Sequence, residues 1–345
     1  MMLTDRQLLI LEAIIRDYTS AGEPIGSKTL QSQLPVHVSS ATIRNEMATL
    51  EKKGYLVKEH SSSGRVPSLK GYRFYVDNLV KPAKVDKKAV QSIRNSFGNE
   101  FQKVDEIVAT SAQVLSDLTN YTAISLKPES KELRLEGFRM VPLGDQQVMV
   151  ILVTSDGTVE SQIFTLPKGI TGDELEPVIR IINDQVVGLP ISKVIPKLRD
   201  SVILLTKYLK QPEGFVDVFG DVMNKALQEQ FYVGGKMNLL NFVKDDNVDQ
   251  VKSLYSLVDH SADIGALLKG ISSDDITVKF GEESKDQPGN YSLISATYDV
   301  KNHGKGVIAL LGPTNMPYSK VIGLLEVFKQ ELIRRLIGYY HNLDS

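Results

Sequence analysis

Residues 39–54 read SSATIRNEMATLEKKG, and this stretch decides the N-terminal fold. Ser39 or Ser40 is a suitable N-cap and Gly54 a suitable C-terminal stop, so the stretch predicts a helix. Apolar residues at helical spacing predict its buried face: Ile43, Met47 and Leu50. The opposite face is polar or small: Ala41, Asn45, Ala48, Thr49 and Lys52, flanked by Thr42 and Arg44.

This opposite face has the properties of a helix that enters a DNA groove. Its small residues allow close approach, Asn45 and Thr42 can hydrogen-bond to base edges, and Lys52 can reach a phosphate. An ordinary solvated helix face has a similar composition. Taken alone, the stretch supports both interpretations equally.

The flanking residues favour the DNA-binding interpretation. Residues 5–19 predict an amphipathic helix capped by Thr4, and Ser27 is expected to cap a short second helix that ends near Leu34. After the third helix, residues 55–57 form a short strand, 60–64 a polar turn, and 65–67 the return strand. Three helices followed by a hairpin with Arg65 near its tip predict a winged helix-turn-helix.

We expect the polar residues of this domain to take two roles. Thr42, Arg44 and Asn45 are the candidates for base edges, with Thr49 on the same helix face. Contacts to phosphate or the minor groove are expected from the remaining candidates: Ser40, Lys52, Lys53 and Arg65. A lone hairpin arginine is usually a solvated cation, and His60 is expected to be a turn residue without a ligand.

Charge is unevenly distributed along the 345 residues, although the net charge is only −2. Residues 24–84 contain ten Lys or Arg and four Asp or Glu, a local charge of +6, which leaves −8 for the rest. A basic block on an acidic chain points to a polyanionic partner.

Composition also excludes several classes of protein. The chain has no cysteine, so disulfide scaffolds, thiolate metal sites and cysteine nucleophiles are excluded. It has no apolar run long enough for a bilayer span and no signal-peptide pattern, and we expect a cytoplasmic protein. The five histidines show no metal-ligand or triad spacing. We therefore expect no enzyme activity, catalytic residue, cofactor or metal.

The remaining chain predicts a mixed domain of helices and strands. Residues 81–84 suggest a hinge, residues 86–119 read as helical, and residues 133–141, 147–154 and 158–166 read as three strands. Helices are expected from 170 to 230, with Pro177 starting or kinking the first, and then two more helices. Three further strands, 276–280, 291–300 and 306–311, and a closing helix, 318–341, complete an α+β arrangement with a helical insertion.

Several motifs resemble those of the HrcA family of heat-inducible transcription repressors. The N-terminal ones are residues 39–47, SSATIRNEM, and 60–68, HSSSGRVPS, followed by 71–77, GYRFYVD. The C-terminal ones are 232–235, YVGG, and 312–318, GPTNMPY. Ser63 stands where the family usually has Ala, and Asn315 and Pro317 where it usually has Arg and Asp, which puts an ionic role for that loop in doubt.

The resemblance implies an α+β multidomain fold with named parts. These are a winged helix-turn-helix in residues 1–80, a connector in 81–100, a GAF-like domain in 101–170 and 231–345, and a dimerisation domain inserted at 171–230. The apolar helices at 178–210 are compatible with a dimer contact and equally with plain core packing.

The resemblance also implies a function. Such a protein represses heat-shock chaperone operons, binds an inverted-repeat (CIRCE-type) operator in double-stranded DNA as a homodimer, and is kept active by a GroEL-type chaperonin until heat inactivates it. The alternative is a winged-helix regulator controlled by a small metabolite bound in the GAF-like domain.

Overall fold

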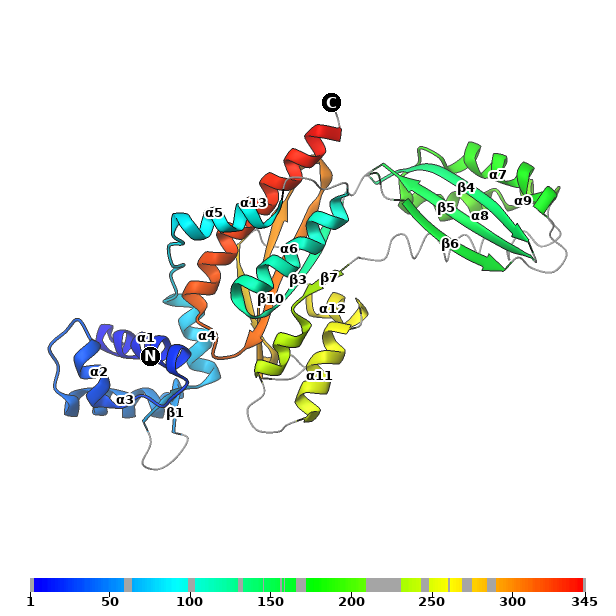
Figure 1. Cartoon of the computed structure of the whole chain (residues 1–345). Helices are drawn as coiled ribbons and strands as arrows, with labels where there is room; N and C mark the ends of the chain where they lie inside the picture. The colour runs from blue at the N-terminus through cyan, green and yellow to red at the C-terminus, as the bar shows by residue number, and fades with distance from the viewer. Residues whose placement is uncertain are drawn as a thin grey trace. The chain divides into compact units, whose positions relative to one another are not determined.

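The computed structural model shows a chain of mixed helices and strands (Figure 1). It describes residues 3–58, 64–98, 103–129, 133–144, 146–155, 157, 159–165, 172–208, 231–242, 248–259, 261–268, 275–283 and 290–343. Contacts divide the chain into a main unit, residues 1–126, 231–298 and 307–345, and an inserted unit, residues 127–230 and 299–306. Among the described residues, no helix is both long and apolar enough to cross a bilayer.

The main unit begins with helices and a short hairpin. The elements are α1 (Asp5–Ala21), α2 (Ser27–Gln33), α3 (Ser40–Lys52), β1 (Leu56–Val57), β2 (Val66–Pro67) and α4 (Leu69–Asn78). The predicted cap of α1 is confirmed, because Thr4 and Gln7 form a capping box. The predicted cap of α2 is wrong: Gly26 is the last extended residue, and Ser27 is already helical.

Strands β1 and β2 pair antiparallel, which confirms the hairpin, with Leu56 opposite Pro67 and Val57 opposite Val66. The backbone of Arg65 also pairs with Ile25, just before α2. This bridge ties the turn-side end of β2 to the segment before α2. The predicted turn, with His60, lies outside the described residues except for Gly64.

The rest of the main unit is built on a five-stranded sheet in the order β7-β3-β10-β9-β8. Its strands are β3 (Thr122–Glu129), β7 (Phe231–Gly234), β8 (Thr277–Phe280), β9 (Tyr291–Asp299) and β10 (Lys305–Pro313). Its helices are α5 (Lys87–Ser96), α6 (Val104–Thr119), α11 (Val248–Asp259), α12 (Ser261–Leu268) and α13 (Tyr318–Leu343), with short helices η1 (Lys236–Phe242) and η2 (Gly281–Glu283). The short helix η3 (Lys301–His303), between β9 and β10, falls in the part of the chain grouped with the inserted unit. Helices α11 and α12 share one apolar cluster with β3, β9 and β10.

Strand β3 was not predicted. The small residues Ala123 and Ser125 are buried, and Ser111 Oγ on α6 donates to Ser125 Oγ at 3.0 Å. Small and polar side chains packed against a helix lack the apolar alternation that marks a strand.

The inserted unit has its own three-stranded sheet, in the order β4-β5-β6. The strands are β4 (Leu135–Gly144), β5 (Gln147–Thr154) and β6 (Val159–Thr165), and the helices are α7 (Gly172–Val186), α8 (Ile191–Asp200) and α9 (Val202–Leu205). The helices lie on one side of the sheet (Figure 1) and share one core with it, including Phe138, Val150 and Ile182. Pro177 lies inside α7, and the predicted helix at 215–230 lies outside the described residues.

This packing corrects the expected boundary at residue 170. The three strands at 133–166 do not extend the five-stranded sheet; they belong with the helices that follow them. Sequence order placed them with the earlier domain, but their apolar face is buried by α7 and α8. The insertion is therefore mixed in structure, and it starts near Lys127.

The expected hinge at residues 81–84 is anchored. The backbone N–H of Ala83 donates to the Ser319 carbonyl at 2.8 Å, and Ser319 Oγ donates to the Lys81 carbonyl at 2.6 Å. A Cβ on Gly323 would overlap the Ala83 carbonyl, so this glycine permits the close approach. The helical stretch predicted after it is broken into α5 and α6, and Phe101 lies outside the described residues.

Candidate nucleic-acid interface

Helix α3 presents the predicted polar face to solvent. Ile43, Met47 and Leu50 are buried, as predicted, against α1 and α2. Ser39 is the N-cap, and its Oγ accepts the Thr42 backbone N–H at 3.1 Å. Five side chains of the outer face are exposed: Ala41, Arg44, Asn45, Ala48 and Lys52. This exposure is what a groove-binding helix requires, and it removes core packing as an explanation for these residues.

The base-reading candidates are not all equally available. Within the described part of the chain, the Arg44 guanidinium and the Asn45 side-chain amide make no hydrogen bond or ion pair. Thr42 Oγ1 lies 2.9 Å from Ser39 Oγ, and Thr49 Oγ1 donates to the Asn45 carbonyl at 3.0 Å. Arg44 and Asn45 therefore keep their hydrogen-bonding capacity for a ligand, while the two hydroxyls are locally engaged.

The candidates for phosphate contacts also divide into accessible side chains and side chains that are bonded within the protein. Lys52 is exposed at the end of α3, and Ser40 is half-buried in its first turn. Lys53 Nζ donates to Gln7 Oε1 at 3.0 Å, toward α1. Arg65 Nε donates to Glu51 Oε2 at 2.7 Å, and the Arg65 side chain is only 15% exposed.

The arrangement around Arg65 holds the hairpin to α3. Glu51 Oε1 also lies 4.0 Å from Nζ of Lys58, the residue that follows β1. The Arg65 guanidinium is thus aimed at α3 and not outward from the hairpin. In this conformation it positions the hairpin, and it would have to leave Glu51 to reach a phosphate.

Gln7 supports the candidate interface from behind, and sequence reasoning missed it. Its side chain is 6% exposed, its Nε2 donates to Glu46 Oε2 at 2.9 Å, and its Oε1 accepts from Lys53. A buried amide that spans α1 and α3 fixes the orientation of α3. The only local signal was a polar residue in line with the apolar stripe Ile10, Leu11 and Ile14.

Two more cations of the basic block are engaged inside the main unit. Lys70 Nζ donates to the Lys53 carbonyl at 2.8 Å and lies 4.5 Å from the Tyr55 ring centroid. Arg73 on α4 pairs with Glu283 and donates to the Val278 carbonyl at 2.9 Å. The hydrogen bond to Glu283 raises the pKa of Arg73, so its charge is fixed inside the main unit.

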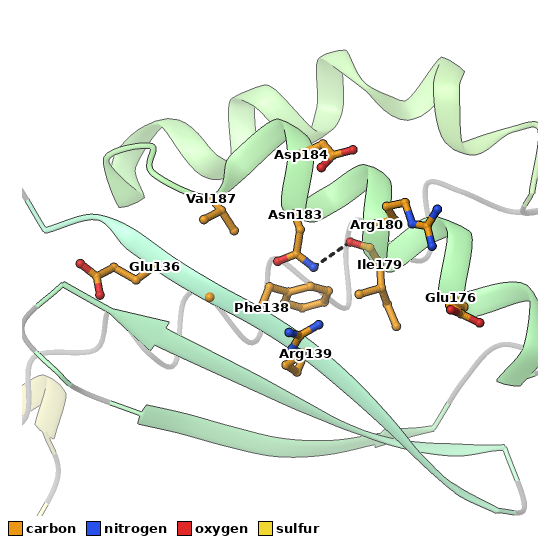
Figure 2. Close-up of a pocket in the computed structure, with 10 residues that line it drawn as sticks. Glu136, Phe138, Arg139, Glu176, Ile179, Arg180, Asn183, Asp184 and Val187 are labelled. Carbon is orange, nitrogen blue, oxygen red and sulfur yellow. Dashed lines mark hydrogen bonds between the residues drawn. The ribbon is translucent and has the colours of Figure 1, made fainter.

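A separate groove of about 530 Å³ lies on the inserted unit between β4 and α7 (Figure 2). Its lining has mixed charge, with Glu136, Glu176 and Asp184 against Arg139 and Arg180. Asn183 Nδ2 donates to the Ile179 carbonyl at 2.9 Å, which keeps its amide on α7. No histidine, serine or threonine is among the lining residues, so no nucleophile–base pair is assembled there. In the described ranges, no group of three or more His, Asp or Glu is arranged to hold a metal ion.

Comparison of the whole chain with known proteins gives consistent matches. A family model for the HrcA protein C terminal domain matches residues 105–322. Heat-inducible transcription repressor HrcA of Ligilactobacillus salivarius is 63% identical, that of Limosilactobacillus reuteri 51% and that of Enterococcus faecalis 46%, each over 100% of both chains. A crystal structure of a hypothetical protein at 2.2 Å resolution aligns with a TM-score of 0.59 and 21% identity, over 97% of this chain and 98% of that one, and it supports the fold alone.

Proposed function

This chain belongs to the HrcA family of heat-inducible transcription repressors, and from that premise we propose how it represses transcription. As a homodimer, it places α3 of each subunit in the major groove of an inverted-repeat, CIRCE-type operator of chaperone operons. Two-fold protein symmetry then matches the two half-sites. Repression is a binding activity and needs no catalytic group, and we place the protein in the cytoplasm with the bacterial chromosome.

One observation carries the DNA-binding proposal: the polar face of α3 is exposed while its apolar face is buried. The three helices and hairpin then act as a winged helix-turn-helix. Arg44 and Asn45 read base edges, since Arg suits guanine and Asn suits adenine. Lys52 neutralises a phosphate, and Arg65 positions the hairpin through Glu51.

The open face of the inserted sheet supports the homodimer. Val159 is 60% exposed and Ile163 is 55% exposed, and they lie opposite Val153 and Met149 on β5. Exposed apolar side chains on the edge strand β6, beside half-buried apolar side chains on β5, favour association with a second copy. Ile163→Asp should shift the chain from dimer to monomer in sedimentation velocity, whereas Glu160→Asp on the same strand should not.

Heat release requires only a marginally stable active dimer. A modest rise in temperature then shifts the population toward an inactive form, and a GroEL-type chaperonin restores it. We expect heating to weaken operator binding by the purified protein and chaperonin with ATP to recover it. A dimer that stays bound well above the growth temperature contradicts this part of the proposal.

The direct test is a gel shift that compares an inverted-repeat operator with a scrambled duplex, at two salt concentrations and two temperatures. Specific binding should exceed non-specific binding by at least about 10³-fold. Asn45→Ala should reduce this ratio, while Lys320→Ala, an exposed change on α13, should leave it unchanged. Equal affinity for both duplexes would refute sequence-specific repression.

A further inference from the structure

Helix α4 connects α3 to the five-stranded sheet, and all three lie in the main unit. The first turn of α4 is fixed to the end of α3, because Ser68 Oγ donates to the Gly54 carbonyl at 2.6 Å. A Cβ on Gly71 would overlap the Tyr55 carbonyl, so this glycine permits a close approach of α4 to the chain that leaves α3. A change in the direction of α4 therefore carries α3 with it.

The next turn of α4 is fixed to the sheet through Arg73. Its guanidinium donates two hydrogen bonds to the Glu283 carboxylate, one of them from Nε to Oε1 at 2.9 Å. Arg73 Nη1 also donates to the Val278 carbonyl at 2.9 Å, and Cζ lies 4.6 Å from the Phe280 ring centroid. Val278 and Phe280 belong to the edge strand β8, and Glu283 to η2, which follows it.

Aromatic packing beside Arg73 holds the same junction without fixing its angle. The ring centroid of Tyr72 lies 6.5 Å from that of Phe280 and 6.0 Å from that of Tyr318, the first residue of α13. Hydrophobic packing is non-directional, whereas an arginine fork on a carboxylate fixes direction as well as distance. Removal of the Arg73 guanidinium should therefore leave α4 attached but free to tilt.

The polar contact lies at the rim of this junction. The Arg73 side chain is 30% exposed and that of Glu283 is 38% exposed, while Tyr72 and Tyr318 are buried. Solvent competes for both charged partners, so the ion pair adds less to stability than a buried pair would. Loss of the pair should change the direction of α4 more than it changes the stability of the fold.

We propose that Arg73 is a positioning residue that sets the spacing of the two α3 helices in a homodimer. This inference rests on the proposed function, because a dimer on an inverted repeat must present its two α3 helices at a fixed separation. Binding of the second half-site is intramolecular, and it adds affinity only when the geometry permits both contacts at once. A tilting α4 spreads the positions of α3 and lowers the effective concentration at the second half-site.

Gel shifts with three duplexes test this role in the full-length chain. They are the inverted-repeat operator, the same operator with about 5 bp added between its half-sites, which turns one half-site by about half a helical turn, and a single half-site. The unchanged chain should bind the operator at least about 100-fold more tightly than the single half-site. Arg73→Ala and Glu283→Gln should each lower operator affinity at least about tenfold, with half-site affinity unchanged and a smaller loss from the added base pairs.

The matched control is Arg16→Ala, which removes an exposed arginine whose ion pair is with its neighbour Asp17 on α1. This variant should behave as the unchanged chain on all three duplexes. Equal losses on the operator and the half-site in Arg73→Ala and Glu283→Gln would mean that the contact only stabilises the fold, and the proposal would be overturned. Unchanged operator affinity in both variants would overturn it as well.

A distance measurement decides the positioning role without DNA. The chain has no cysteine, so spin labels can be attached at two exposed sites, Ala21→Cys on α1 and Gln330→Cys on α13. With an excess of unlabelled chain, double electron–electron resonance should give one narrow distance distribution, which Arg73→Ala and Glu283→Gln broaden and Arg16→Ala does not. An unchanged distribution in the first two variants would overturn the proposal.

Failure of the proposed function has a different signature. The unchanged chain would then bind the operator no better than a scrambled duplex, while the distance distribution would still broaden without Arg73. That result would retain Arg73 as the residue that orients α4 and would refute operator spacing as its purpose.

Discussion

The ion pair between Arg65 and Glu51 allows a sharp test of how the hairpin works. Two roles are open to Arg65: it neutralises a DNA phosphate, or it fixes the hairpin to α3. The structure favours the second, because Arg65 Nε lies 2.7 Å from Glu51 Oε2 and the Arg65 side chain is 15% exposed. Arg65→Ala removes the donor of this contact, and Glu51→Gln removes the negative charge of its acceptor.

The size of the effect follows from the burial of the pair. A charge-assisted hydrogen bond contributes about 1.5–3 kcal/mol when well shielded. Glu51 is 31% exposed, so solvent screening lowers this figure, and we expect each variant to lose about 1–2 kcal/mol of unfolding free energy. The double variant should lose less than the sum of the two, with a coupling of about 1 kcal/mol, because both changes remove the same contact.

Two measurements separate the roles. Urea denaturation measures the free energy of unfolding. The salt dependence of operator affinity counts phosphate contacts, because each contact changes the slope of log affinity against log salt concentration by about 0.9. If Arg65 positions the hairpin, neither single variant changes the salt slope. Lys52→Ala, the exposed control, should lower that slope by about 0.9 per subunit with little change in stability. A slope lowered by Arg65→Ala but not by Glu51→Gln would refute the positioning role.

Three further predictions follow from other contacts. Arg44→Ala should cost about 1–3 kcal/mol on the operator and little on a scrambled duplex; equal losses in a gel shift would show a phosphate contact instead. Gly323→Ala should destabilise the chain by about 1–3 kcal/mol because its Cβ overlaps the Ala83 carbonyl, whereas Gly338→Ala should stabilise α13, as thermal melts would show. Burial raises the pKa of three tyrosines, Tyr72, Tyr298 and Tyr318, so the folded state holds their protons more tightly than the unfolded state. Their contribution to stability should be constant just below pH ~10 and should be lost as the pH rises above it, as alkaline titration of the unfolding free energy would show.

Local patterns were sufficient to predict α3 and its two faces. Its cap at Ser39, its apolar spacing and its C-terminal glycine act within one helix, so periodicity and cap chemistry identify them. The same holds for the hairpin β5–β6, whose strands follow each other in the chain. Strand β3 pairs with β7 across more than a hundred residues, and no local signal marks such a pairing.

The sequence could not show which side chains pair with each other, because the partners lie far apart along the chain. Gln7 and Lys53 are 46 residues apart, and Glu51 on α3 is 14 residues away from Arg65, which precedes β2. Counting cations along the sequence treats each as available to DNA, whereas the fold pairs several of them internally. The exposure of the α3 face was therefore predicted correctly, and the internal pairing of Lys53 and Arg65 was not; which candidates bind DNA stays a prediction.

The internal pairing of cations lowers the number of phosphate contacts that we predict between the protein and DNA. The basic block has ten cations, but Lys53, Arg65, Lys70 and Arg73 make close contacts inside the main unit. Around α2 and α3, the exposed cations without a described partner are Lys28, Arg44 and Lys52. With Arg44 on a base edge, Lys28 and Lys52 give two phosphate contacts per subunit and a salt slope of about −1.8, or about −4 for a dimer, against about −18 for a dimer if all ten cations met phosphates. Operator affinity measured between about 50 and 200 mM salt distinguishes these values. A dimer slope steeper than about −10 would mean that the internal pairs open on DNA, and the positioning role of Arg65 would fail with them.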